Sequence, residues 1–232
     1  NAALKVLNRD PLILDRAGSY IGTLIDDLVT KGTNEPYRIM TSRSEYRLLH
    51  RQDNADERLS AIGHRIGLVS DARFAAVQEK YRLVDAECAR LEKTHLAPSD
   101  ALAAMLTAPT SSGVSLADLL RRPQITYADL APFDPARPEL PRVVTEQAEI
   151  RLKYAGYIQR QLRQVAEFTR LEERLLPPDL DYGQVSCLRL EARQKLSDIR
   201  PASLGQASRI SGVSPADIAT LMVYLESREG QK

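Results

Sequence analysis

Apolar residues recur at helical spacing along most of the chain. From Phe74 to His95 they return every three or four positions, which predicts a helix of roughly six turns. Ser70 is the expected N-cap of this helix and His95 its last residue. A second long helix is predicted over 145–176, with Thr145 near its cap and two prolines after its end. The chain is therefore expected to be mainly α.

Shorter elements are predicted around these two helices. Apolar positions over 19–29 are typical of a helix that Gly32 stops, and a short helix is expected over 53–62. Tyr37, Ile39 and Thr41 alternate as in a short strand. The proline-rich stretch 97–142 favours a connecting region with only short helices. Three further helices are expected over 188–197, 202–211 and 215–227.

Charge and composition narrow the class of protein. Lys and Arg number 32 against 31 Asp and Glu, which excludes a strongly basic nucleic-acid coat but leaves room for a local basic patch. No run approaches the ~18 apolar residues of a membrane span, and no secretory signal is present, so no membrane partner is expected. The two cysteines, Cys88 and Cys187, are too few for a disulfide framework and favour a reducing compartment. Since the chain opens at Asn1, we expect it to be a piece of a longer protein.

The sequence contains no complete active site. It has no glycine-rich dinucleotide loop, no phosphate loop, no His-Glu-x-x-His and no Cys-x-x-Cys. His50, His64 and His95 fall on separate predicted elements without the spacing of metal ligands. We therefore predict no catalytic residue, no cofactor-binding residue and no metal site in this chain.

One basic segment is the candidate binding site. Arg43, Arg47 and Arg51 follow one another at intervals of four, which would place them on one face of a helix. A row of guanidinium groups suits phosphate, because each planar fork donates two hydrogen bonds. The alternative is a solvated helix surface neutralised by nearby carboxylates. With neighbouring and C-terminal cations, the candidate set is Lys31, Arg38, Arg43, Arg47, Arg51, Arg193 and Arg209.

The last two predicted helices resemble a helix-turn-helix. A DNA-reading second helix needs basic or amide side chains, and 215–225 has no basic residue. It has instead an apolar face, which is either a docking surface for a partner or part of the core. That face consists of Ile218, Leu221, Met222 and Leu225.

Several segments resemble one known family. They are LIDDLVTKGT at 24–33, EPYR at 35–38, TSRSEYRL at 41–48, RQDNAD at 51–56 and RPASLGQASRISGVSP at 200–215. Together with LLRRP at 119–123 and KYAGYI at 153–158, they are similar to the tRNA uridine 5-carboxymethylaminomethyl modification enzymes, also called glucose-inhibited division protein A, or MnmG/GidA. Cys187 stands where this family usually has Gly, so its thiol is not expected to be catalytic.

The resemblance implies a flavoenzyme that modifies the wobble uridine of tRNA, using FAD and NADH bound to a Rossmann-type domain upstream of Asn1. Accordingly, 1–35 would be the tail of that domain with a short extended segment, 36–176 a helical domain with the arginine segment, and 177–232 a small helical subdomain. The arginine set would bind tRNA, and the face at 218–225 would bind the GTPase partner MnmE. A cytoplasmic homodimer is implied for the intact protein. The competing interpretation is a free-standing helical adaptor or a helix-turn-helix DNA-binding regulator.

Overall fold

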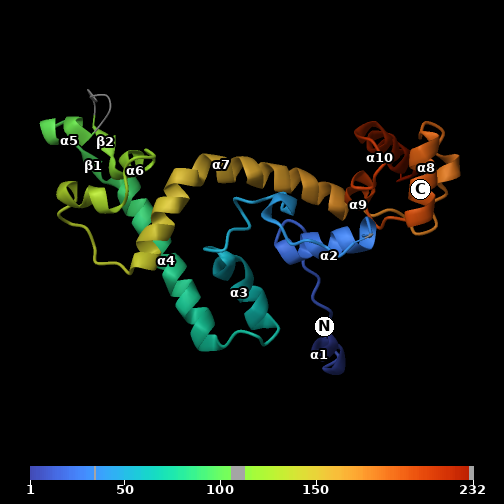
Figure 1. Ribbon diagram of the computed structural model, residues 1–232, viewed down its shortest axis with the longest axis horizontal. Helices are drawn as coiled ribbons and strands as arrows, with labels where there is room; N and C mark the ends of the chain where they lie inside the picture. Colours follow the sequence, from blue (N-terminus) through green and yellow to red (C-terminus); the bar gives the residue numbers. More distant parts are fainter. Residues whose placement is uncertain (34, 106–112, 230–232) are drawn as a thin grey trace. The chain divides into compact units, whose positions relative to one another are not determined.

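The computed structural model describes residues 1–33, 35–105 and 113–229. Almost all regular structure in them is helical (Figure 1). The main helices are α1 (Ala2–Val6), α2 (Tyr20–Thr30), α3 (Ala55–Arg65), α4 (Asp71–Lys93), α5 (Asp100–Met105), α6 (Leu116–Leu120), α7 (Arg142–Glu173), α8 (Leu190–Ile199), α9 (Leu204–Ser208) and α10 (Pro215–Glu229). Short 3-10 helices are η1 (Thr41–Arg43), η2 (Ala128–Phe133) and η3 (Tyr182–Gln184).

The chain forms two compact units. Unit 1 consists of Asn1–His50 with Arg160–Lys232, and unit 2 of Arg51–Gln159. Helix α7 contributes its first part to unit 2 and its last turns to unit 1. Neither unit boundary coincides with the divisions at 35/36 and 176/177 expected from the sequence.

Unit 2 is built on the α3–α4 hairpin, whose two helices lie side by side in Figure 1. Ser70 caps α4 by accepting a hydrogen bond from the Arg73 amide, as the sequence predicted. The core of this unit lies where α4 packs against α6 and the first part of α7. Its fully buried members include Val84, Leu91, Leu116, Leu119 and Leu120.

A two-stranded ladder closes the end of α4. Strands β1 (His95–Leu96) and β2 (Val114–Ser115) pair antiparallel, with His95 opposite Ser115. The prediction that His95 ends the long helix is therefore wrong. The helix ends at Lys93, because Thr94 adopts an extended conformation and leads the chain into β1.

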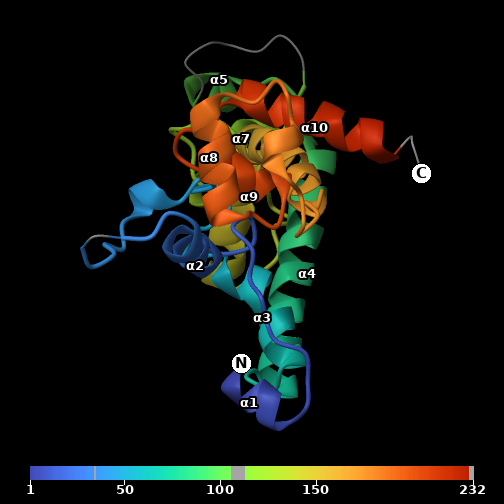
Figure 2. The same ribbon diagram turned by 90° about the vertical axis from the view of Figure 1, so that its right-hand side faces the viewer.

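Unit 1 has its hydrophobic core among α8, α9 and α10, which lie together in Figures 1 and 2. Leu196, Leu204 and Leu221 are fully buried there. Ser203 caps α9 by accepting a hydrogen bond from the Gln206 amide. Ser214 and Asp217 hold the start of α10, so the strong start signal at this position is confirmed.

Three local predictions differ from the structure. Residues 37–41 are not assigned to a strand, and no helix runs through the segment from Arg43 to Arg51. Ser44 is extended and interrupts the helical path after η1, so the intervals of four do not create one arginine face. The second long helix begins at Arg142, directly after Pro141, and Thr145 lies inside its first turns instead of capping it.

Candidate functional site

The polar centre of unit 1 is a buried arginine that the sequence analysis did not single out. Arg16 is only 4% exposed and donates hydrogen bonds to Asp26 (2.9 Å), Asp27 (2.8 Å) and Glu45 (2.7 Å). It also donates to the carbonyl oxygen of Thr23 (3.2 Å). Three carboxylates around one buried guanidinium fix helix α2 and the turn at 45–49 to one another. The paired Asp26 and Asp27 were the available signal, but sequence spacing does not identify their partner.

Helix α2 can lie against the backbone of Leu14 and Asp15, just before Arg16, because it carries a glycine there. Ser19 caps the helix by accepting a hydrogen bond from the Gly22 amide. A Cβ added at Gly22 would lie 2.0 Å from the Asp15 carbonyl oxygen, so no larger residue fits there.

The electrostatics of this centre favour its charged state. Burial by itself raises the pKa of Asp27, but hydrogen bonds from Arg16, Lys31 and Tyr37 outweigh it and hold the pKa below the usual range. Burial and the hydrogen bond to Asp27 raise the pKa of the Tyr37 phenol. Asp27 therefore remains a carboxylate that accepts from three donors.

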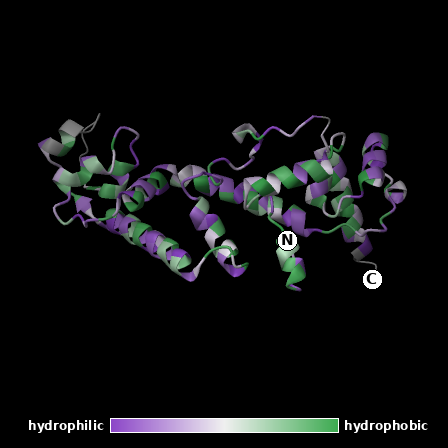
Figure 3. Ribbon diagram, turned by 60° about the horizontal axis from the view of Figure 1, so that its bottom comes forward, coloured by the Kyte–Doolittle hydropathy of each residue, from purple (hydrophilic) through white to green (hydrophobic). Residues whose placement is uncertain are grey.

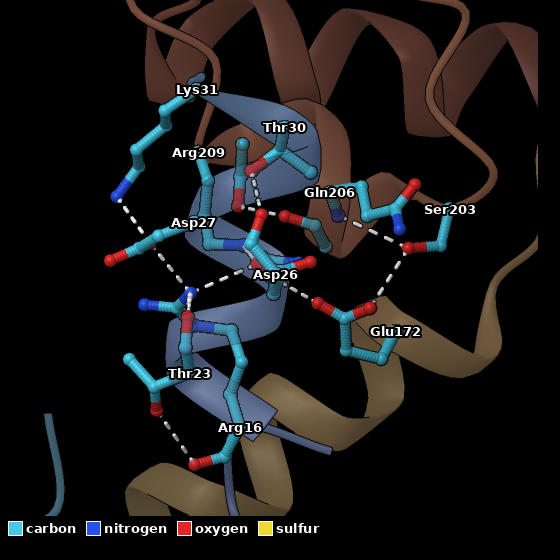
Figure 4. Close-up of polar contacts among 12 residues, drawn as sticks. Arg16, Thr23, Asp26, Asp27, Thr30, Lys31, Glu172, Ser203, Gln206 and Arg209 are labelled. Carbon is cyan, nitrogen blue, oxygen red and sulfur yellow. Dashed lines mark hydrogen bonds and ion pairs between the residues drawn. The ribbon is translucent and has the colours of Figure 1, made fainter. Parts of the chain in front are cut away.

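A second arginine extends the network toward the C-terminal helices (Figure 4). The side chain of Arg209 is 9% exposed, pairs with Glu172, and donates to Asp26 at 3.1 Å. Glu172 in turn accepts a hydrogen bond from the Ser203 hydroxyl (3.0 Å). Arg209 was expected to bind tRNA, but its guanidinium is occupied by carboxylates that connect α2, α7 and α9 within unit 1. A phosphate would have to compete with these carboxylates for the guanidinium, so the tRNA-binding role of Arg209 stays a prediction that its ion pairs disfavour.

Beside the Arg16 centre lies an open hollow of about 400 Å³. Lys31 is 47% exposed and reaches Asp27 at 3.0 Å. Arg43 stacks over the ring of Tyr37, 4.3 Å from its centroid. The lining residues are Arg16, Asp27, Lys31, Gly32, Thr33, Tyr37, Arg43 and Glu45. This polar recess thus contains cations, an aromatic ring, and carboxylates that already accept hydrogen bonds from Arg16.

A smaller, more apolar hollow of about 210 Å³ is also part of unit 1. The Tyr20 hydroxyl donates to the Met40 carbonyl oxygen (3.0 Å) and so holds the chain before η1. His50 Nε2 lies 2.7 Å from the Ala17 carbonyl oxygen, which can only accept. Nε2 therefore donates this hydrogen bond, and Nδ1 lies 3.1 Å from the Ser44 hydroxyl oxygen. Exposed Arg47 lies at the rim of this hollow.

The predicted phosphate-binding cations differ in whether nearby groups of the protein already hold their side chains. Arg51 pairs with Asp53 (3.1 Å), and Arg193 donates to the Val185 carbonyl oxygen (3.3 Å), so both have local partners. Arg38 is exposed and makes one long contact with Glu35 at 3.4 Å. Within the described residues, Arg43 and Arg47 form no ion pair with a carboxylate. The structure places Lys31, Arg38, Arg43 and Arg47 in unit 1 and Arg51 in unit 2.

The apolar face of the last helix is not an exposed docking surface. Ile218, Leu221 and Leu225 are buried in the core of unit 1, and Met222 packs against the same cluster. The expectation that these four side chains contact a partner is therefore corrected, because they fill the space between α10 and its neighbours α8 and α9. Val223, on another side of the helix, is 66% exposed.

The described part of the chain holds two free thiols and no cluster of metal ligands. It contains no cluster of three His, Cys, Asp or Glu side chains able to hold a metal ion. Burial raises the pKa of the Cys88 thiol to about 11, and Cys187 is an exposed free thiol. None of the described helices is long and apolar enough to cross a lipid bilayer.

Comparison with known families gives two adjacent matches. Residues 71–162 match the "tRNA modifying enzyme MnmG/GidA C-terminal helical domain", and residues 164–232 match the "tRNA modifying enzyme MnmG/GidA C-terminal helical bundle". The two matches meet between Leu162 and Gln164, close to the division of the units within α7.

Whole-sequence relatives agree with these matches. The chain is 55% identical to the tRNA uridine 5-carboxymethylaminomethyl modification enzyme MnmG of Caldicellulosiruptor saccharolyticus and 53% identical to that of Lachnoclostridium phytofermentans. Both similarities cover 100% of this chain and 38% of the relative. The chain thus spans little more than a third of these relatives.

A solved structure has the same fold. It is Aquifex aeolicus GidA in its form II crystal, with a TM-score of 0.80 and 39% identity over 97% of this chain and 36% of that one.

Proposed function

Because the chain belongs to the MnmG/GidA family and consists of its C-terminal helical part, we propose that it is the tRNA-binding region of a larger tRNA-modifying enzyme. The full-length protein would install a carboxymethylaminomethyl group on carbon five of the wobble uridine. The described residues form no complete active site, so this part would bind and orient tRNA while the chemistry takes place elsewhere in the protein. The alternative, a free-standing adaptor or DNA-binding regulator, has no support in the family matches.

One observation carries the proposal: among the described residues no carboxylate pairs with Arg43 or Arg47, whereas Arg16 and Arg209, also in unit 1, are each held by at least two carboxylates. A guanidinium that no carboxylate holds can exchange water and counterions for a phosphate at little cost, whereas one held by several carboxylates cannot. Lys31 would add charge to the hollow that Arg43 lines, and exposed Arg38 would add charge to the same segment. Tyr37 holds Arg43 in place by stacking, which pre-organises its fork for a phosphate.

A local patch is also consistent with the near-neutral charge of the chain. With a net charge of +1, long-range attraction of nucleic acid would be weak, so affinity would depend on a few well-placed cations. RNA-binding proteins combine such phosphate contacts with polar recesses that accept splayed nucleotides. The hollow of about 400 Å³ next to Arg43 suits this second task.

The experiment is a salt titration of tRNA binding by the full-length protein, with an unmodified transcript carrying a wobble uridine. We expect Arg43→Gln and Arg47→Gln each to weaken binding and to lower the slope of log K against log salt by about 1, without a change in Tm. Arg82→Gln is the matched control, since it removes one exposed cation of unit 2 that is paired with Glu79. Equal effects of all three variants would indicate only a loss of general charge, and no effect of the first two would refute the proposed site.

We further propose that the full-length protein uses FAD and NADH, as the family resemblance implies. The residues of this chain do not fit either cofactor. The sequence has no glycine-rich dinucleotide loop, and the described strands β1 and β2 are two residues long each and form no βαβ unit. We therefore assign no cofactor contact to this part, and a purified sample of it should be colourless.

The remaining proposals concern assembly. We propose that the full-length protein is a cytoplasmic homodimer that acts with the GTPase MnmE. A contact with MnmE at α10 would have to use the exposed side of that helix, because Ile218, Leu221 and Leu225 are buried. Val223→Glu should then weaken MnmE binding with an unchanged Tm, and unchanged binding would place the partner on another element.

A further inference from the structure

Helix α2 buries a polar side and exposes an apolar side. Its side facing the protein is polar: Gly22, Thr23 and Asp27 are buried, and Asp27 pairs with Arg16. Its apolar side chains point away from unit 1 and cover an arc of about 100° around the helix axis. Among them, Ile21 is 55%, Ile25 52% and Val29 71% exposed, and Leu28 lies between them at 36%.

The polar contacts on the inner side fix the rotation of α2 about its own axis. Arg16 holds Asp26 and Asp27, Arg209 holds Asp26 as well, and Tyr37 donates to Asp27 at 2.9 Å. Turning the apolar face inward would remove Asp26 and Asp27 from these two guanidinium groups. Arg16 would keep only Glu45 and Arg209 only Glu172 as carboxylate partners, which is costly for charges held inside the protein. The network therefore fixes the direction in which the apolar face points.

Exposed apolar side chains are concentrated at this end of the sequence. Of the eighteen large apolar side chains exposed among the described residues, nine lie within residues 1–40. That stretch is only about a sixth of the chain, so the enrichment is roughly threefold. Besides α2, it includes Val6 on α1, a short helix that is largely apolar in Figure 3. A contiguous apolar face of this kind marks a surface that is covered in the working protein.

The family matches indicate what covers it. Both matching domains are C-terminal, and they begin at residue 71, so residues 1–70 lie outside them. The relatives contain further chain besides the 38% of their length that this chain covers. We propose that the apolar face of α2, formed by Ile21, Ile25, Leu28 and Val29, is an intramolecular docking surface for the part of the full-length protein that precedes this chain. Helix α2 would then join the two parts, with a polar attachment on one side and an apolar one on the other. This surface does not depend on tRNA binding.

The first test measures accessibility within the full-length protein. Single cysteines are placed by Ile25→Cys and Val223→Cys in a Cys187→Ser background, and maleimide labelling of each peptide is followed by mass spectrometry. The two positions are similarly exposed in this chain, at 52% and 66%. We expect Ile25→Cys to react at least tenfold more slowly than Val223→Cys, after each rate is normalised to the rate in denaturant. Similar rates at both positions would overturn the proposal.

The second test identifies what covers the face. A photo-crosslinking amino acid at position 25 of the full-length protein should capture a peptide from the preceding part of the same molecule. The yield should not change on tenfold dilution. Capture of a second copy, with a yield that falls on dilution, would overturn the proposal in favour of a dimer contact. Capture of residues 51–159 would overturn it in favour of a contact between the two units of this chain.

Discussion

Helices α2 and α10 belong to the same unit, and both carry an apolar face of four large side chains, yet they use these faces in opposite ways. In α10, Ile218, Leu221 and Leu225 are buried in the core. In α2, Ile21, Ile25 and Val29 point outward, and the buried side is polar. The periodicity of a sequence therefore tells which residues share a face, but not whether the surface that covers the face lies in the same unit.

The difference follows from what each helix meets on its inner side. Helix α10 is held at its start by Asp217, which accepts from Arg189 (2.6 Å) and from the Ser214 amide (2.8 Å), and its apolar face then packs against α8 and α9. Helix α2 meets Arg16 and Arg209, which require carboxylates. These guanidinium groups decide its orientation because taking carboxylates away from a cation inside the protein costs more than exposing an apolar side chain.

The largest effect should come from breaking the polar attachment of α2. We expect Arg16→Met to destabilise unit 1 by about 3–5 kcal/mol, because it leaves three carboxylates without their buried cation. Lys31→Met is the matched control: Lys31 also pairs with Asp27 but is half exposed, so its loss should cost about 1 kcal/mol or less. Urea unfolding followed by circular dichroism measures both. Equal losses would show that the Arg16 network does not hold the helix.

A slightly smaller effect is expected from the apolar attachment of α10. Leu221→Ala should cost about 2–5 kcal/mol, since Leu221 is fully buried in the core of unit 1. Val223→Ala, two residues further along the same helix and exposed, should change the free energy of unfolding by less than about 0.5 kcal/mol. If the two substitutions had similar effects in the same urea titration, α10 would not pack against the core of unit 1 through the face that contains Leu221.

A third prediction concerns acid. Hydrogen bonds from Arg189 and Ser214 outweigh burial and hold the pKa of Asp217 well below its usual value of 3.8. Asp217 thus binds a proton less readily in the folded than in the unfolded state, so its stabilisation is complete above about pH 4 and is lost as the pH falls further. Asp217→Asn should therefore cost about 1–3 kcal/mol at pH 7 and progressively less below pH 4. Exposed Asp10→Asn is the control, and a pH-independent difference for Asp217→Asn would contradict the expectation.

The smallest effect should come from the outer face of α2. In this chain alone, Ile25→Gln should change the free energy of unfolding by less than about 0.5 kcal/mol, because the side chain has little to lose on the surface. Ile218→Gln, the same substitution on α10, should cost several times more, since it buries an amide without an assigned partner. Thermal unfolding of the two variants side by side tests this. A large loss for Ile25→Gln would mean that the outer face is already covered within the chain.

The arginines also show that sequence spacing does not reveal which ion pairs a side chain forms in the folded protein. Sequence spacing grouped Arg43, Arg47 and Arg51 on one helix, but the extended Ser44 breaks that path and Arg51 belongs to unit 2. Arg209 resembled a free surface cation, whereas the fold surrounds it with Glu172 and Asp26. Arg16 had no distinguishing motif, yet the fold surrounds it with Asp26, Asp27 and Glu45.

By itself, the sequence determined the helical class, the family, the long helix that begins after Ser70, and the start of the last helix at Ser214. These features depend on local periodicity and on capping side chains within three residues of the amides they accept from. The tertiary structure alone decided which cations are free, which apolar face is inside, and that the end of α4 continues into a β ladder with Ser115. Those outcomes depend on partners such as Asp26 and Arg209, which lie 183 positions apart and meet only when the chain has folded.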